Sequence, residues 1–208
     1  MTRAVSGSAA AATRPAVRGP RRLSRAARRE QLINAAIPVL ASGGLSGFSL
    51  DEIAARADVT RNLLYHYFPR GRDDVVVAVA EAVGHRLTDD WVTDESVPLE
   101  GRIATNIGRM VEHAAGPSDV WRIYQLARGS TDPRLRETVA RFEATVIESI
   151  SLNQLGTADP PALVRVALQG YLAFFAVALD EGRAGSIEPE RLLAFLNETL
   201  AATLRAAA

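Results

Sequence analysis

One short predicted helix carries side chains that can read a nucleic acid. Arg61 can pair bidentately with guanine, Asn62 can pair with adenine, and an exposed Leu63 can touch a thymine methyl group. We expect Tyr65 and His66 to face outward beside them, although Leu63 could instead be a partly buried filler and Tyr65 an ordinary packing aromatic. The N-terminal residues of a recognition helix lead when it enters a major groove. This helix therefore predicts contacts with the edges of DNA base pairs.

A second set of side chains around this helix is better suited to phosphates. Phosphate contacts set the position of a protein on DNA and carry no sequence information. Ser49 could equally serve only as a helix cap, since it forms a Ser-x-x-Glu pattern with Glu52. Tyr67 could instead pack between two parts of the molecule. The predicted phosphate contacts are Ser49, Thr60, Tyr67 and Arg72.

Two short helices must position these side chains. The sequence predicts a helix over residues 50–57, a tight turn at 58–59 and a second helix over 60–67, preceded by a longer helix over 25–42 that Gly43-Gly44 ends. Two short helices joined by so tight a turn are a helix-turn-helix candidate. The apolar side chains that can form a core beneath them are Ile33, Ala36, Leu40, Phe48, Ile53, Ala54, Ala57, Val59, Leu64 and Phe68.

The stretch from residue 49 to residue 72 resembles the DNA-binding segment of the tetracycline-repressor (TetR) family, and the likeness extends over about residues 25–85. The resemblance implies that the positions named above contact DNA. Asp58 and Asn62 stand where the family often has Gly, and residues 69–72 are one longer than the common form, with Arg where Lys is usual. Asp tolerates a left-handed backbone, so the turn is expected to form. The residues that carry the likeness are Ile53, Ala54, Ala57, Val59, Thr60, Leu64, Tyr65, Tyr67 and Phe68.

The rest of the chain has helical periodicity and no convincing strand. The predicted helix over residues 160–182 is apolar on both sides, which is typical of a helix that is buried on both sides, and the last predicted helix carries a stripe of leucines. A second copy of the chain is the simplest cover for these faces. We therefore expect a homodimer formed through the last two helices. The predicted helices of this body cover residues 73–91, 98–115, 117–128, 133–152, 160–182 and 188–207.

The resemblance also implies that the body binds a small-molecule effector and that binding changes the separation of two DNA-reading heads. We expect a mostly apolar ligand with a few polar groups, because the candidate lining residues are mainly aromatic or carry an amide. Each of them could equally be plain core. The candidates are Trp91, Asn106, Met110, His113, Trp121, Tyr124, Gln125, Phe142, Gln169, Tyr171 and Phe174.

Charge divides the chain unevenly. Residues 1–72 hold 12 arginines against 4 acids, a net charge of +8, and residues 73–208 hold 12 arginines against 20 acids, a net charge of −8. A basic first third predicts a polyanionic partner, which we take to be a double-stranded DNA operator. The Arg-rich tail, residues 1–24, is expected to be flexible and either to enter a minor groove or to stay solvated.

Composition argues against several other classes of protein. The chain has no cysteine, no lysine and three histidines without metal-ligand spacing, so we expect no metal, no cofactor and no catalytic residue. Arginines interrupt every candidate signal peptide. The longest apolar run, residues 171–179, is about half of the roughly 20 residues that a membrane span needs. We expect a cytoplasmic protein that is not an enzyme and does not contact a membrane.

The sequence thus predicts an all-α protein with a three-helix N-terminal helix-turn-helix head, residues 25–72, and a helical ligand-binding and dimerisation body, residues 73–208. The function that we predict is that of a ligand-responsive transcriptional regulator. It is expected to act as a repressor that binds a palindromic operator as a dimer and is released by a small molecule. The alternative is a helical small-molecule-binding protein that has lost specific DNA binding.

Overall fold

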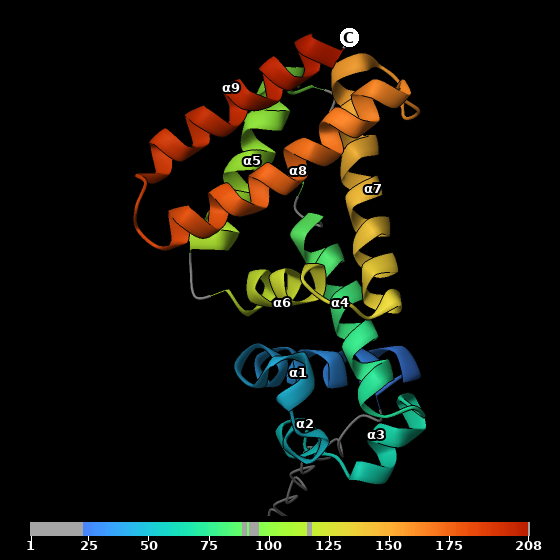
Figure 1. The fold of residues 1–208 in the computed structure, drawn as a ribbon. Helices are drawn as coiled ribbons and strands as arrows, with labels where there is room; N and C mark the ends of the chain where they lie inside the picture. Colours follow the sequence, from blue (N-terminus) through green and yellow to red (C-terminus); the bar gives the residue numbers. More distant parts are fainter. Residues whose placement is uncertain (1–22, 89–90, 92–95, 116–117, 208) are drawn as a thin grey trace, which may run out of the picture.

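A computed structural model describes residues 23–88, 91, 96–115 and 118–207, so most of the Arg-rich tail lies outside the described residues. Within these ranges the chain forms nine helices and no strand, which confirms the all-α prediction (Figure 1). The helices are α1 (Arg25–Gly47), α2 (Leu50–Arg56), α3 (Arg61–Tyr67), α4 (Arg72–Thr88), α5 (Leu99–Ala115), α6 (Asp119–Arg128), α7 (Pro133–Leu155), α8 (Ala162–Arg183) and α9 (Pro189–Ala207).

Helices α1, α2 and α3 form the head. Leu32, Ile53 and Leu64, one from each helix, are fully buried in its core. Gln31 ties the helices further, because its Nε2 donates to the carbonyl of Ala57 between α2 and α3 at 2.9 Å. The break expected after residue 42 falls at Gly44, whose φ of 71° is left-handed and readily adopted by glycine.

Helix α4 joins the head to the body. It starts beside α3 and packs against α1, α6 and α7, so its two ends lie in different parts of the molecule (Figure 1). Arg86 of α4 donates to the Oδ1 atom of Asn34 in α1. On the other side, Arg141 of α7 pairs with Glu81 at 3.2 Å. One continuous helix therefore contacts both the head and the body.

Helices α5 to α9 form the body, and α8 and α9 lie side by side at the end far from the head (Figure 1). Leu168 and Leu179 of α8 are buried, whereas Leu163, Val166 and Val177 on another side are exposed. By length and composition α8 could cross a membrane, a test that core helices of soluble proteins also pass. The apolar run of residues 171–179 lies within α8, the apolar helix that the sequence predicts over residues 160–182.

Candidate nucleic-acid interface and internal cavity

Both short helices of the head start with the caps that the sequence predicts. The Ser49 Oγ accepts a hydrogen bond from the Glu52 amide at 3.3 Å, and the Thr60 Oγ1 accepts one from the Leu63 amide at 3.3 Å. An N-cap oxygen satisfies an amide that has no partner inside the helix. Leu64, buried beneath α3, fixes which side of that short helix faces the core.

The outward side of α3 carries most of the predicted base contacts. Arg61, Asn62, Tyr65 and His66 are exposed, whereas Leu63 is half-buried. The four exposed side chains include a guanidinium, an amide and an imidazole, which can all hydrogen-bond base edges in a major groove. The structure thus brings these predicted residues to one surface at the end of the head.

Tyr67 differs from its neighbours on α3. Its side chain is half-buried and packs against the hydrophobic core, with its ring edge-on to the ring of His66 at 5.4 Å between centroids. This placement fits the packing role that the sequence left open beside a phosphate contact.

Arg61 is held by two side chains. Its Nη1 lies 3.0 Å from Asp51 Oδ1 and 2.9 Å from Asp51 Oδ2, and its Nη2 donates to the hydroxyl of Tyr65 at 3.4 Å. These contacts raise the pKa of Arg61, with the Tyr65 hydrogen bond as the largest cause. About half of the Arg61 side chain and two thirds of the Asp51 side chain are exposed, at 53% and 66%. Asp51 therefore holds the guanidinium in an accessible position and also competes for it.

Arg72, which the sequence predicts as a phosphate contact, makes contacts within the protein. Its Nη2 donates to the carbonyl of Ser46, and its guanidinium lies 4.3 Å from the centre of the Phe48 ring. Cation–π contacts of this kind stabilise a fixed side-chain position. Arg72 therefore links the start of α4 to the segment before α2, although its residue remains exposed.

A shallow depression on this surface gathers four of the predicted contacts: Ser49, Arg61, Tyr65 and Arg72. Sequence reasoning missed Arg70, which also lines the depression. The Nε of Arg70 pairs with Asp74 Oδ1 at 2.7 Å, and its amide donates to Asp74 Oδ2 at 2.8 Å. These contacts hold the pKa of Asp74 below its usual value, and the amide hydrogen bond is the largest cause.

The turn between α2 and α3 accommodates the unusual Asp58. This residue has a φ of 52°, the left-handed backbone that the sequence analysis expected Asp to tolerate. The following amide, that of Val59, donates to the carbonyl of Ala54 at 3.0 Å and so closes the turn. The replacement of the more usual glycine thus leaves the helix-turn-helix geometry in place.

The family model for bacterial regulatory proteins of the tetR family matches residues 32–79, which include α2 and α3. This segment of the chain is a TetR-family DNA-binding segment. A 66-residue segment is 38% identical to the HTH-type transcriptional regulator SrpR of Pseudomonas putida and 36% identical to the HTH-type transcriptional regulator TtgW of the same species. This segment is 32% of the chain and spans 30% and 48% of those two relatives.

The likeness to solved structures extends beyond the head. A tetR-family transcriptional regulator from Streptomyces coelicolor superimposes with a TM-score of 0.74 over 89% of this chain and 84% of that one. The two sequences are 22% identical, so the superposition shows a common fold. The TetR-family head of this protein is therefore recognisable in its sequence, whereas its body is recognisable only in its fold.

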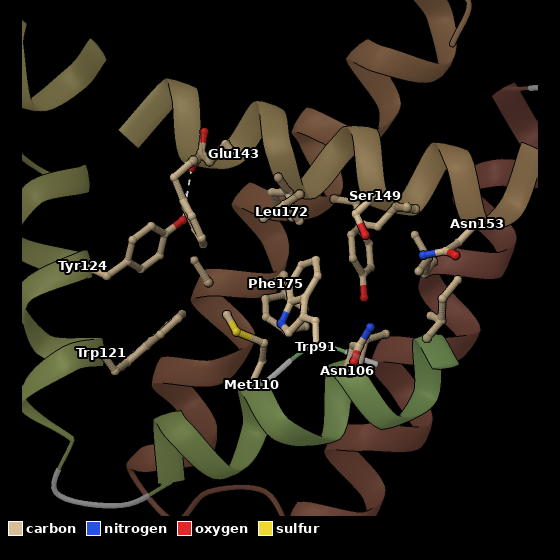
Figure 2. Close-up of a pocket in the computed structure, with 18 residues that line it drawn as sticks. Trp91, Asn106, Met110, Trp121, Tyr124, Glu143, Ser149, Asn153, Leu172 and Phe175 are labelled. Carbon is tan, nitrogen blue, oxygen red and sulfur yellow. Dashed lines mark hydrogen bonds between the residues drawn. The ribbon is translucent and has the colours of Figure 1, made fainter. Parts of the chain in front are cut away.

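The body of the protein contains a cavity of about 60 Å³, lined by residues of α5 to α9 and by Trp91, which follows α4. Figure 2 shows Tyr124 and Glu143 toward one end, Asn106 and Asn153 toward the other, and Trp91 between them. Most of the remaining wall is apolar. The cavity can thus surround a small apolar molecule and offer polar groups at a few points.

Polar groups at one end of the cavity are already paired. The Tyr124 hydroxyl donates to Glu143 Oε1 at 3.1 Å, and Arg128 Nε lies 3.4 Å from the same oxygen. Burial, and to a lesser extent the Glu143 charge, raises the pKa of Tyr124. Burial likewise raises the pKa of Tyr171, whose hydroxyl donates to the carbonyl of Leu196 at 3.0 Å. Both phenols therefore stay protonated as donors.

Both tryptophans of the chain line this cavity, but their indole nitrogens differ. Trp121 Nε1 donates to Asp180 Oδ1 at 3.2 Å. Trp91 Nε1 is buried without a hydrogen-bond partner. A buried donor without a partner is uncommon in folded proteins and requires an explanation.

Seven of the predicted ligand contacts line the cavity and four do not. Gln125 instead bonds the Asp180 carboxylate at 2.5 Å, Gln169 is exposed, and the half-buried His113 lies outside the lining. Phe174 belongs to the outer side of α8 and packs edge-on against Phe195 of α9. The predicted residues that the cavity does gather are Trp91, Asn106, Met110, Trp121, Tyr124, Phe142 and Tyr171.

Sequence reasoning missed the polar side chains that α7 contributes and one of the two aromatic side chains that α8 contributes. Glu143, Ser149 and Asn153 line the cavity, as does Phe175. The spacing 142, 146, 149, 153 continues one face of α7 and was the available signal for Ser149 and Asn153. Phe175 lies next to the predicted Phe174, and only packing decides which of two adjacent aromatic residues faces inward.

Proposed function

We propose that this protein is a DNA-binding transcriptional regulator whose dimer binds a palindromic operator and is released by a small molecule. The observation that carries the proposal is the capped helix α3 with Arg61, Asn62, Tyr65 and His66 exposed on one side. The family match over residues 32–79 supports the same role for this segment. Repression follows in this proposal because a protein bound at an operator obstructs transcription until the effector arrives.

The proposed DNA contacts divide by chemistry. Arg61, Asn62 and His66 are assigned to base edges, and the half-buried Leu63 to a thymine methyl group. Tyr65 supports Arg61 through its hydroxyl. Ser49, Thr60 and Arg72 are assigned to phosphates, as is Tyr67 beside its packing role.

The proposed dimer forms through α8 and α9. Leu163, Val166 and Val177 of α8 are 64%, 62% and 60% exposed, and Phe195 of α9 is 51% exposed. The three α8 residues, with Gly170 and Ala173 between them, follow helical spacing, so they form one apolar stripe. Such a stripe is self-complementary in a two-fold symmetric pair, which is the commonest arrangement of soluble homo-oligomers.

Dimerisation provides the geometry that an operator requires. Two recognition helices must lie about one DNA turn apart, roughly 34–36 Å, to engage both half-sites. The head, residues 25–72, and the body, residues 73–208, are connected by α4, which packs against both. We infer that an effector in the cavity shifts the end of α4 near Trp91 and so changes this separation.

The alternative is a small-molecule-binding protein that has lost specific DNA binding. Asp51 favours it, because an acidic side chain holds the leading arginine of α3. The pairing is solvent-exposed, however, and exposed ion pairs contribute only about 0–1 kcal/mol, which phosphate and base contacts can offset. The same exposed surface serves no evident purpose in a protein that binds only a small molecule.

The test is selection of the purified full-length protein against random duplex DNA, followed by titration of the enriched sequence at two salt concentrations. We expect a palindrome, and affinity that falls steeply with salt because phosphate contacts release counterions. No enrichment with a folded dimer would contradict the regulator proposal and favour the alternative. Enrichment of a single half-site by a monomer would contradict the proposed dimer.

A further inference from the structure

One residue that lines the cavity carries a buried hydrogen-bond donor that the described part of the protein leaves unmatched. Among the described residues, three buried side-chain polar atoms have no hydrogen-bond partner: Trp91 Nε1, Arg102 Nε and Ser151 Oγ. Only Trp91 lines the cavity (Figure 2). Leaving a buried donor unpaired is unfavourable, and an acceptor that enters the cavity relieves this penalty.

The second tryptophan shows that the unpaired state of Trp91 is specific. Trp121 lines the same cavity, and its indole N–H is taken by Asp180 Oδ1. Two residues of one type thus share one cavity, with one donor satisfied by the protein and the other not. The contrast indicates that the acceptor for Trp91 comes from a bound molecule.

The charged groups of the cavity argue against a cationic ligand. Within the part of the chain that the structure describes, Glu143 is the one acidic residue in the lining. Its Oε1 already accepts from Tyr124, and Arg128 lies against the same oxygen. A cation at this carboxylate would have to compete with a guanidinium that is part of the protein. The unmet requirement of the cavity is therefore an acceptor and not a positive charge.

We propose that the effector is a small, uncharged and mostly apolar molecule with an oxygen that accepts a hydrogen bond from Trp91 Nε1, as a ketone or an ester does. This inference rests on the proposed function in taking the cavity as the effector site. The apolar part of the effector packs against the apolar wall of the cavity, and its oxygen fixes its orientation.

The size of the cavity limits the size of the molecule. A water molecule needs about 10–15 Å³ by this measure. The cavity of about 60 Å³ thus accepts a molecule of few heavy atoms, and the oxygen of that molecule reaches the buried Trp91 Nε1 when side chains around the indole shift. Cyclohexanone is a suitable probe, and methylenecyclohexane is its match in shape without the oxygen.

The first experiment measures the dissociation constants of both probes by NMR titration of the full-length protein and of Trp91→Phe. Trp91→Phe keeps an aromatic ring and removes the donor, so it should lower the preference for cyclohexanone over methylenecyclohexane roughly three- to tenfold. Comparing this ratio between the wild-type protein and the variant cancels the difference in how readily each probe leaves water. An unchanged ratio, or failure of both probes to bind the wild-type protein, overturns the proposal.

Trp121→Phe is the matched control. It removes an indole from the same cavity wall, but one whose N–H the protein already satisfies. The ratio of the two constants should therefore stay within about twofold of the wild-type value. A loss of preference equal to that of Trp91→Phe would assign the effect to cavity shape and overturn the proposal.

A measurement on the wild-type protein covers the case in which Trp91→Phe does not fold. The chain has two tryptophans, so a ¹⁵N–¹H spectrum contains two indole signals, which Trp121→Phe assigns. Cyclohexanone should shift the Trp91 signal downfield, and methylenecyclohexane should not. Equal shifts with both probes overturn the proposal, as does tighter binding of the cyclohexylammonium cation.

These titrations contain no DNA, so the inference and the proposed function fail separately. Selection of a palindrome together with a probe ratio that Trp91→Phe leaves unchanged would support the regulator proposal and contradict the proposed effector class. A Trp91-dependent ketone preference without any DNA enrichment would retain the ligand class and favour the small-molecule-binding alternative.

Discussion

The head and the body of this protein differ in how their candidate sites are built. In the head, the exposed side chains from Thr60 to His66 come from one short helix and its cap. In the body, the cavity takes its wall from five helices and from Trp91. The two sites have no residue in common, so a substitution in one leaves the side chains of the other in place. We infer that DNA recognition and effector recognition can vary separately in this chain.

The largest expected effect concerns the outer side of the body. Val177→Glu places a charge within the proposed dimer interface, where an unpaired charge costs roughly 3–5 kcal/mol, so dimer affinity should fall by about a hundredfold or more. Light scattering across protein concentrations measures it. Ala144→Glu adds the same charge at an exposed position of α7 and should leave the dimer intact. Dimerisation that survives Val177→Glu would show that another surface joins the subunits.

A substitution in the head should affect DNA and not the cavity. Arg61→Ala is expected to weaken operator binding by about 1–3 kcal/mol and to relax base preference at one position. Cyclohexanone binding should stay as in the wild-type protein. Arg122→Ala, at an exposed position of α6, is the control, and quantitative binding to operator variants is the measurement. Equal losses on specific and random DNA would instead make Arg61 a phosphate contact.

A substitution at Gly71 tests whether the head requires a glycine beside Tyr65. It has a φ of 61°, and a Cβ there would lie 3.1 Å from Cε1 of Tyr65. Gly71→Ala should therefore lower the free energy of unfolding by about 1–2 kcal/mol and displace Tyr65 from Arg61. Gly47→Ala, where a Cβ meets no atom within 4 Å, should have little effect. Urea unfolding followed by circular dichroism compares the two variants, and equal stabilities would contradict the strain.

Removal of the Asp51 carboxylate that holds Arg61 should strengthen operator binding, whereas Arg61→Ala should weaken it. Asp51→Asn frees the guanidinium and deletes a negative charge near DNA, so operator affinity should rise by up to about fivefold, the scale of an exposed ion pair. Asp58→Asn removes the same charge from the head without an ion pair to Arg61 and should raise affinity less. Weaker binding by Asp51→Asn would show that Asp51 orients Arg61 more than it competes with DNA.

The smallest effect concerns pH. Contacts with Arg70 lower the pKa of Asp74 in the folded protein, so the unfolded chain binds a proton more readily. The stability from this carboxylate is present above its ordinary pKa and is lost as pH falls through the lower folded value. The difference in unfolding free energy between wild type and Asp74→Asn should shrink in that acidic window. Glu112→Gln neutralises an exposed carboxyl as the control, and a difference independent of pH would contradict the linkage.

Much of the head could be predicted because its signals are local. The caps at Ser49 and Thr60, the left-handed turn at Asp58 and the exposed face of α3 each depend on residues a few positions apart. The contacts of Arg61 and Arg72 could not be predicted in this way. The pairing of Arg61 with Asp51 and the contact of Arg72 with Phe48 join residues of different elements, which no local pattern specifies.

The sequence alone determined the all-α class, the position of every described helix to within a few residues, and the TetR resemblance. It did so because helical periodicity, caps and turn residues act within about one or two turns of the chain. Only the tertiary structure decided that Phe175 and not Phe174 faces the cavity, that α7 supplies Glu143 and Asn153, and that Trp91 keeps an unpaired donor there. Those outcomes depend on how several helices pack together, and the periodicity of one helix does not contain the position of its neighbours.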